Sequence, residues 1–190
     1  MFVQKKKYYF LIESIKDINL ENLKKRNKFT IIYRNQTNLE KKEDLLRFRK
    51  KCRSKAINFY IANDLNLATE LFSDGIYLSA HNRSFKALSY KSSKFQVIGS
   101  AHSQKEIFLK KKQGCVFIIF SKLFLVNYDK SAPYLGLIKF NNLLKIYKNL
   151  IPLGGINVNN LNNLNLVNCK GFVSKSEIKK KPTNFISRLF

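Results

Sequence analysis

Eight short apolar runs, spread along the whole chain, are the feature that most limits what this sequence can fold into. They lie at residues 8–13, 29–34, 58–63, 75–80, 95–101, 115–121, 151–155 and 171–175. Most are nearly continuous and rich in Ile, Val, Phe or Tyr, which is typical of parallel strands that are covered on both faces. The sequence therefore predicts eight buried strands.

Several of the segments between these runs can form helices. The charged segment 39–52 can pack through Leu45, Leu46 and Phe48, and Ser103 with Glu106 forms a capping-box sequence at the start of another helix. Two further segments carry apolar stripes at helical spacing, 138–150 and 157–168, the second behind the candidate N-cap Asn157. Segments 14–28 and 81–94 can hold only short or irregular helices, and 122–137 is expected to be a long loop.

Strands that alternate with helices indicate a parallel α/β protein, and eight strands is the count of a (β/α)8 TIM barrel. A length of 190 residues suits one small barrel, so we expect a single domain over residues 1–190. The main alternative is a doubly wound open sheet. Since no GxGxxG follows an early strand, its dinucleotide-binding version is disfavoured.

The formal net charge is +24, which points to an anionic partner or to the Lys-rich codon usage of an A/T-rich genome. The lysines are spread along the chain, without a concentrated basic tract, a zinc motif or an RNA-binding aromatic signature. These features favour small phosphorylated molecules over nucleic acid as partners.

Compartment and assembly are constrained only weakly. No apolar run approaches the roughly 18 residues of a membrane helix, and the N-terminal run is interpreted as a first strand and not as a signal peptide. Cys52, Cys115 and Cys169 are far apart and form no CxxC. We therefore expect no membrane partner and a reducing cytoplasm, while the oligomeric state stays open, a homodimer included.

In a barrel of this class, chemistry sits where the strands end, and phosphate often binds after the last two strands. Gly154 and Gly155 end the run at 151–155, and Lys175 and Ser176 stand where the last run ends. Glycines let backbone amides approach an anion closely, so these four residues form a candidate phosphate cup. The alternative interpretation of the glycine pair is a tight turn.

Polar residues also follow three earlier runs. Asn63 and Asp64 could bind Mg²⁺ that bridges to a diphosphate, although Asp64 could instead cap a helix that begins at Leu65. Arg34 suits a diphosphate through paired hydrogen bonds. Single histidines such as His102 are more often structural than catalytic.

Several stretches in this order carry a family resemblance. They are AND (62–64), DGIYLSAHN (74–82), IGSAHSQKE (98–106), GCVFIIFSKLF (114–124), APYLG (132–136), IPLGGI (151–156) and GFVSKSEI (171–178). On these stretches the chain resembles the thiamine-phosphate synthase/TenI family of small (β/α)8 barrels. The resemblance implies that hydroxymethylpyrimidine diphosphate and thiazole phosphate are joined to thiamine phosphate, with Mg²⁺ assisting the departure of diphosphate.

The resemblance also implies roles for individual residues. Arg34 and Asn63 would bind the diphosphate, Ser100 would lie near the pyrimidine, and Asp64 with Asn82 would hold Mg²⁺. Lys130 would meet the leaving diphosphate. The candidate cup would take the thiazole phosphate through four residues: Gly154, Gly155, Lys175 and Ser176.

The chain departs from the family pattern at several positions. Ile32 and Gln36 replace the Gln and Lys of the arginine motif, Asn82 replaces a carboxylate, and residues 126–130 replace a Thr-x-Thr-Lys loop. TenI-type tautomerases use a His where this chain has Lys122, a potential base if its pKa were depressed. The alternatives to a synthase are therefore a TenI-like thiazole tautomerase and a non-catalytic barrel that binds phosphorylated ligands.

Overall fold

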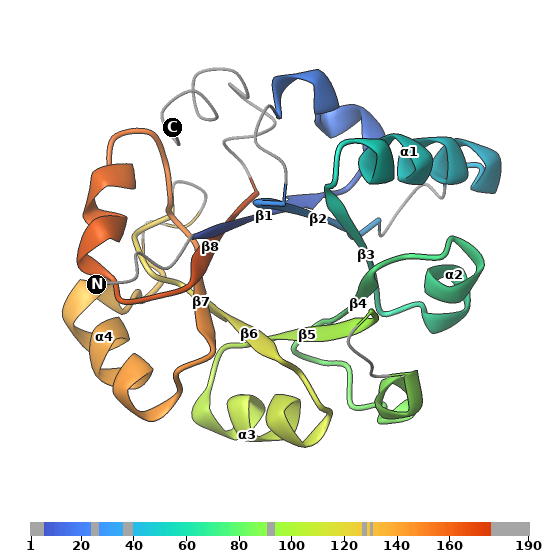
Figure 1. Cartoon of the computed structure of the whole chain (residues 1–190). Coiled ribbons are helices and arrows are strands. Elements are labelled where there is room, and N and C mark those ends of the chain that lie inside the picture. Colours follow the sequence, from blue (N-terminus) through green and yellow to red (C-terminus); the bar gives the residue numbers. More distant parts are fainter. Residues whose placement is uncertain are drawn as a thin grey trace.

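The structure is a computed structural model that describes residues 6–23, 27–35, 40–90, 94–126, 129 and 131–175. Eight parallel strands form one sheet in the order β7-β6-β5-β4-β3-β2-β1-β8. Figure 1 looks through the ring of strands: β7 and β8 come together to complete it, and the helices lie outside. The predicted TIM barrel is confirmed, and the open doubly wound sheet is excluded by the ring.

The strands lie close to the predicted runs. They are β1 (Lys7–Ile12), β2 (Phe29–Tyr33), β3 (Asn58–Ala62), β4 (Gly75–Leu78), β5 (Gln96–Ala101), β6 (Phe117–Ser121), β7 (Leu150–Leu153) and β8 (Gly171–Ser174). The strand β7 ends before the glycine pair, which belongs to the turn that follows.

Helices and 3₁₀ turns connect the strands. The α-helices are α1 (Lys42–Ser54), α2 (Leu65–Glu70), α3 (Gln104–Lys112) and α4 (Gly136–Ile146). The 3₁₀ helices are η1 (Ile15–Asp17), η2 (Leu20–Asn22), η3 (Lys86–Tyr90) and η4 (Leu161–Leu166). The short helices predicted within 14–28 and 81–94 are thus 3₁₀ turns.

Two helix starts show how local chemistry decides the outcome. Ser103 Oγ accepts a hydrogen bond from the amide of Glu106, as predicted, while the Glu106 carboxylate binds the amide of His102 instead of Ser103. The helix predicted over 157–168 is wrong in extent. The Asn157 side chain accepts from the amides of Asn159 and Asn160, and this turn competes with helix, which leaves only η4.

Side chains on the two faces of the sheet form two separate cores. The outer face packs against the helices through residues such as Phe10 and Phe29, whose rings lie 5.4 Å apart. The inner core fills the barrel with alternate residues of the strands: Tyr9, Leu11, Ile32, Tyr60, Tyr77, Ile98, Ile119, Ile151 and Val173. The barrel is therefore a packed core, and ligand chemistry is confined to its mouth.

Among the described residues, no helix is long and apolar enough to cross a membrane. All three cysteines are buried, and none forms a disulfide.

Deleting the Phe10 ring tests the outer core. Phe10 is fully buried, so we expect Phe10→Ala to lower the free energy of unfolding by about 3–5 kcal/mol. The control is Phe108→Ala on α3, where the ring is 59% exposed and the change should stay within about 0.5 kcal/mol. Urea denaturation measures both. Equal losses would contradict this packing.

Candidate active site at the barrel mouth

The inner rows of side chains continue past the packed core to the carboxyl ends of the strands. Side chains on a strand alternate between its faces, so the residue two positions after an inward one also points inward. That rule brings polar or charged residues from six strands to the mouth: Glu13, Arg34, Ser79, Ser100, Ser121 and Lys175. Three of them, Arg34, Ser100 and Lys175, are sequence-predicted site residues.

Arg34 lies just after β2, and one nitrogen of its guanidinium group lacks a hydrogen-bond partner in the described part of the chain. Its Nε is buried and has no hydrogen-bond partner among the described residues. Burial raises the pKa of Tyr77, while a hydrogen bond with Ser100 and the nearby charge of Arg34 work in the opposite direction. Arg34, Tyr77 and Ser100 are therefore close together, with an orphaned donor that suits an anion.

Asn63 and Asn82 meet above β3 and β4. Asn63 has a left-handed backbone, with φ of 61°, and its Oδ1 accepts from Ser79 N at 2.9 Å and from Asn82 Nδ2 at 3.1 Å. Asn82 Oδ1 in turn accepts from Ser84 N at 2.9 Å. The structure thus brings the two predicted asparagines together, but each uses its side chain to hold the other.

Asp64 caps α2, as the alternative interpretation expected. Its Oδ1 accepts from Leu67 N at 2.9 Å, and the side chain is exposed. The described residues contain no cluster of three His, Cys, Asp or Glu that could hold a metal ion. Mg²⁺ often binds through one carboxylate together with substrate phosphates. The second carboxylate oxygen of Asp64, beside the Asn63 amide, could therefore supply the single protein carboxylate that such a Mg²⁺ ion needs.

The turn after β7 explains why two glycines stand side by side. Gly154 and Gly155 have φ of 99° and 68°, a region that favours glycine. A Cβ on Gly155 would lie 2.3 Å from the Leu125 carbonyl, and one on Gly154 would lie 3.0 Å from Lys122 Cβ. The pair packs directly against the loop after β6, so the tight turn alone already requires both glycines.

This turn also leaves backbone donors free. In the part of the chain that the structure describes, neither the Gly154 nor the Gly155 amide donates a hydrogen bond. Their carbonyls are occupied, since Gly154 O accepts from Phe124 N at 3.0 Å and Gly155 O from Asn160 Nδ2 at 2.7 Å. Rigid amides of this kind suit a phosphate.

Lys175 lies beside β1 and forms an ion pair that the sequence did not predict. Its Nζ is 2.9 Å from Glu13 Oε1, and both side chains are close to half exposed. Its partner in the predicted cup, Ser176, lies outside the described residues, as do Lys130 and Gln36.

The end of β6 gathers further polar groups. His102 Nδ1 lies 2.9 Å from Ser121 Oγ, a contact between two neighbouring strand ends. Lys122 follows Ser121, and its Nζ is 3.9 Å from Asp129 Oδ2. Lys122 therefore lies directly after β6 and next to an acidic group, and its role as a base stays a prediction.

Sequence reasoning missed the roles of Glu13 and Ser121. Both could have been found by extending the period-two alternation of their strands by one more inward position. The His102 contact had no sequence signal, because it joins residues from different strands.

A closed parallel barrel with polar groups and glycine turns at its carboxyl ends defines the class: a (β/α)8 barrel with its site at the mouth. Within that class, the sequence model of the family described as "Thiamine monophosphate synthase" matches residues 10–178. The chain therefore belongs to the thiamine monophosphate synthase family.

Individual proteins resemble this chain in sequence or in fold. A thiamine-phosphate synthase of Persephonella marina is 26% identical over 154 residues, 79% of this chain and 74% of that protein. The solved structure of a thiamine phosphate pyrophosphorylase from Pyrococcus furiosus superposes with a TM-score of 0.72 at 15% identity, covering 98% of each chain. A 3-keto-L-gulonate-6-phosphate decarboxylase from Vibrio cholerae has a TM-score of 0.64 at 14% identity, covering 98% and 99%. These structures share the fold.

The glycine turn can be tested with a matched pair of substitutions. Gly155→Ala adds a Cβ that meets the Leu125 carbonyl, whereas Gly136 has a similar φ of 70° and open space around its Cβ position. We expect Gly136→Ala to cost about 1 kcal/mol from backbone strain alone, and Gly155→Ala to cost about 2–4 kcal/mol because overpacking is added. Chemical denaturation of both variants measures the difference. Equal costs would mean that the turn tolerates a Cβ.

Proposed function

We propose that this chain is a thiamine-phosphate synthase, which joins hydroxymethylpyrimidine diphosphate to thiazole phosphate and releases diphosphate. Membership of the thiamine monophosphate synthase family supports a role in thiamine biosynthesis. The single observation that carries the proposal is the buried, unpartnered Nε of Arg34 at the barrel mouth. A buried donor without an acceptor is costly, and a bound diphosphate would supply that acceptor.

The reaction asks the protein mainly to hold two anions in line. The bond between the pyrimidine methylene carbon and the diphosphate oxygen breaks, and its electron pair leaves with the diphosphate. The thiazole nitrogen then donates its lone pair to that carbon. No side chain needs to take up a proton, so positioning and charge stabilisation carry the catalysis.

The predicted site residues then have separate roles in the proposal. Arg34 and Asn63 bind the diphosphate, and Ser100, fixed by Tyr77, faces the pyrimidine. When bound, Mg²⁺ neutralises charge on the departing diphosphate, and Asp64 and Asn82 would hold it. Lys130, in a part of the chain that is not described, is the candidate for a further contact to the leaving group.

The thiazole phosphate would bind at the other side of the mouth. The free amides of Gly154 and Gly155 would donate hydrogen bonds to the phosphate. Lys175 and Ser176 would complete the cup. Lys175 would then share its charge between Glu13 and the phosphate.

The three buried cysteines, which form no disulfide, support a reducing compartment such as the cytoplasm for this activity.

Asp64→Asn separates the two tasks of this residue. Asn caps a helix as well as Asp does, so the melting temperature should stay close to that of the unaltered protein. The variant lacks the carboxylate, so Mg²⁺-dependent formation of thiamine phosphate should fall about 100-fold or more. The control Asp64→Ala should also lose about 1 kcal/mol of stability with the cap. Full activity in Asp64→Asn would remove Asp64 from the site.

Arg34→Lys tests the diphosphate contact. Lysine keeps the charge but not the planar fork, so we expect the KM for pyrimidine diphosphate to rise about tenfold. The KM for thiazole phosphate should not change, because its cup lies across the mouth. Steady-state kinetics with each substrate varied in turn gives both values. A rise in the second KM alone would contradict the assignment.

The same assay separates the alternatives. If the unaltered protein forms no thiamine phosphate but still binds thiazole phosphate, the synthase proposal fails. The tautomerase and the non-catalytic barrel then remain, and Lys122→Ala distinguishes them. Loss of thiazole tautomerisation with unchanged binding would assign the base to Lys122. The adjacent Ser121 forms a hydrogen bond with His102.

A further inference from the structure

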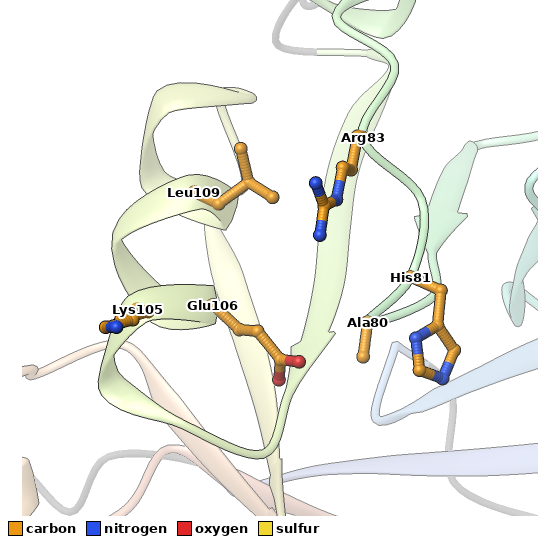
Figure 2. Close-up of a pocket in the computed structure, with 6 residues that line it drawn as sticks. All are labelled: Ala80, His81, Arg83, Lys105, Glu106 and Leu109. Carbon is orange, nitrogen blue, oxygen red and sulfur yellow. The ribbon is translucent and has the colours of Figure 1, made fainter.

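The loop after β4, residues 79–85, carries Asn82 and has a cavity on each side; we call it the β4 loop. One cavity, of about 320 Å³, separates Ala80, His81 and Arg83 of the loop from α3. Figure 2 shows Arg83 directed across this cavity toward the side of α3 that carries Glu106 and Leu109. The second cavity, of about 470 Å³, separates Asn82 and Ser84 from the start of α2. The β4 loop is therefore flanked by an open cavity on each side.

Two buried side chains, one in α3 and one at its C-cap, form hydrogen bonds to the β4 loop. Lys110 and Gln113 are both fully buried. Lys110 Nζ donates to Asn82 O at 2.7 Å and to Gln113 Oε1 at 2.9 Å. Gln113 Nε2 donates to Asn82 O at 3.0 Å and to Ser84 O at 2.8 Å. Together they place three hydrogen bonds on two carbonyl oxygens of the loop.

Lys110 is an unusual residue for this place. It forms no ion pair with a carboxylate among the described residues, and burial lowers its pKa. Its stem lies against β5, where a Cβ on Gly99 would come within 2.8 Å of Lys110 Cδ. Apolar side chains usually serve such sites better than a buried charge. Burying the ammonium group costs desolvation free energy that an apolar side chain would avoid. In return, the ammonium donates hydrogen bonds to the loop.

The β4 loop is connected to the candidate diphosphate site through hydrogen bonds to Asn63. The carbonyl that Lys110 and Gln113 bind belongs to Asn82, whose side chain donates to Asn63 Oδ1 at 3.1 Å. Ser79, at the other end of the loop, also donates to Asn63 Oδ1. Apart from hydrogen bonds to η3, which follows it directly, the β4 loop in the described part of the chain is bonded to other elements through Asn63 and the α3 pair.

We propose that Lys110 and Gln113 are positioning residues for the diphosphate site, because they hold the β4 loop and, through it, the contact between Asn82 and Asn63. The inference rests on the proposed function, since it concerns the same site. It predicts that a change outside the barrel, behind β5, alters diphosphate binding and leaves the thiazole phosphate cup unchanged.

Lys110→Met tests this, because Met keeps an apolar stem of similar length and removes the charge and its donors. Titration calorimetry with inorganic diphosphate and Mg²⁺, and separately with thiazole phosphate, measures both sites without turnover. We expect diphosphate affinity to fall about tenfold and thiazole phosphate affinity to stay within about twofold. Lys111→Met is the matched control: its Nζ lies 4.7 Å from the Tyr147 ring, away from the loop, so neither affinity should change.

Gln113→Glu keeps the experiment informative if Lys110→Met does not fold. The carboxylate can still pair with Lys110 but cannot donate to Asn82 or Ser84, so diphosphate affinity should fall in a folded protein. Unchanged diphosphate affinity in either folded variant overturns the inference, and so does an equal loss at both sites, which would show a general structural role. If the unaltered protein does not bind diphosphate, the proposed function fails and the inference with it.

Discussion

The packing of tyrosine and aliphatic side chains inside the barrel is the interaction on which the rest of this structure depends. Tyr9, Tyr60 and Tyr77 are almost completely buried there, and Tyr60 satisfies its hydroxyl by donating to Gln96 Oε1 at 2.8 Å. This core fixes which residues of every strand face inward. Because it is filled, polar chemistry is left to the single layer above it, where Arg34 and Lys175 emerge.

The sequence was informative wherever one segment could determine its own structure. A strand buried on both faces must be apolar along its whole length, so composition alone located the eight strands within a few residues. Their number and alternation with helices then selected a barrel, and the barrel rule for strand ends located Arg34, Asn63 and the glycine pair at the mouth. The family resemblance pointed to the same positions, and the match over residues 10–178 agrees with it.

What the sequence did not predict involves partners far apart in the chain. Lys110 is one of three consecutive lysines in the last turn of α3, and its spacing of three from the buried Ile107 places it on the inner side of that helix. Likewise Asn82 could be recognised as a replacement for a carboxylate, but not as a residue already bonded to Asn63 and Ser84. Local patterns specify which face of an element a side chain occupies. They do not specify which polar group of another element becomes its hydrogen-bond partner.

The ion pair between Glu13 and Lys175 gives the mouth its own internal counter-ion. An anion that approaches Lys175 does not meet a bare charge; it must share the ammonium with a carboxylate already 2.9 Å away. The free energy gained is then the difference between two competing pairings and not the strength of one. On a chain of net charge +24, such competition discriminates against loosely held anions. A phosphate that also reaches the glycine amides has the additional contacts needed to outcompete Glu13.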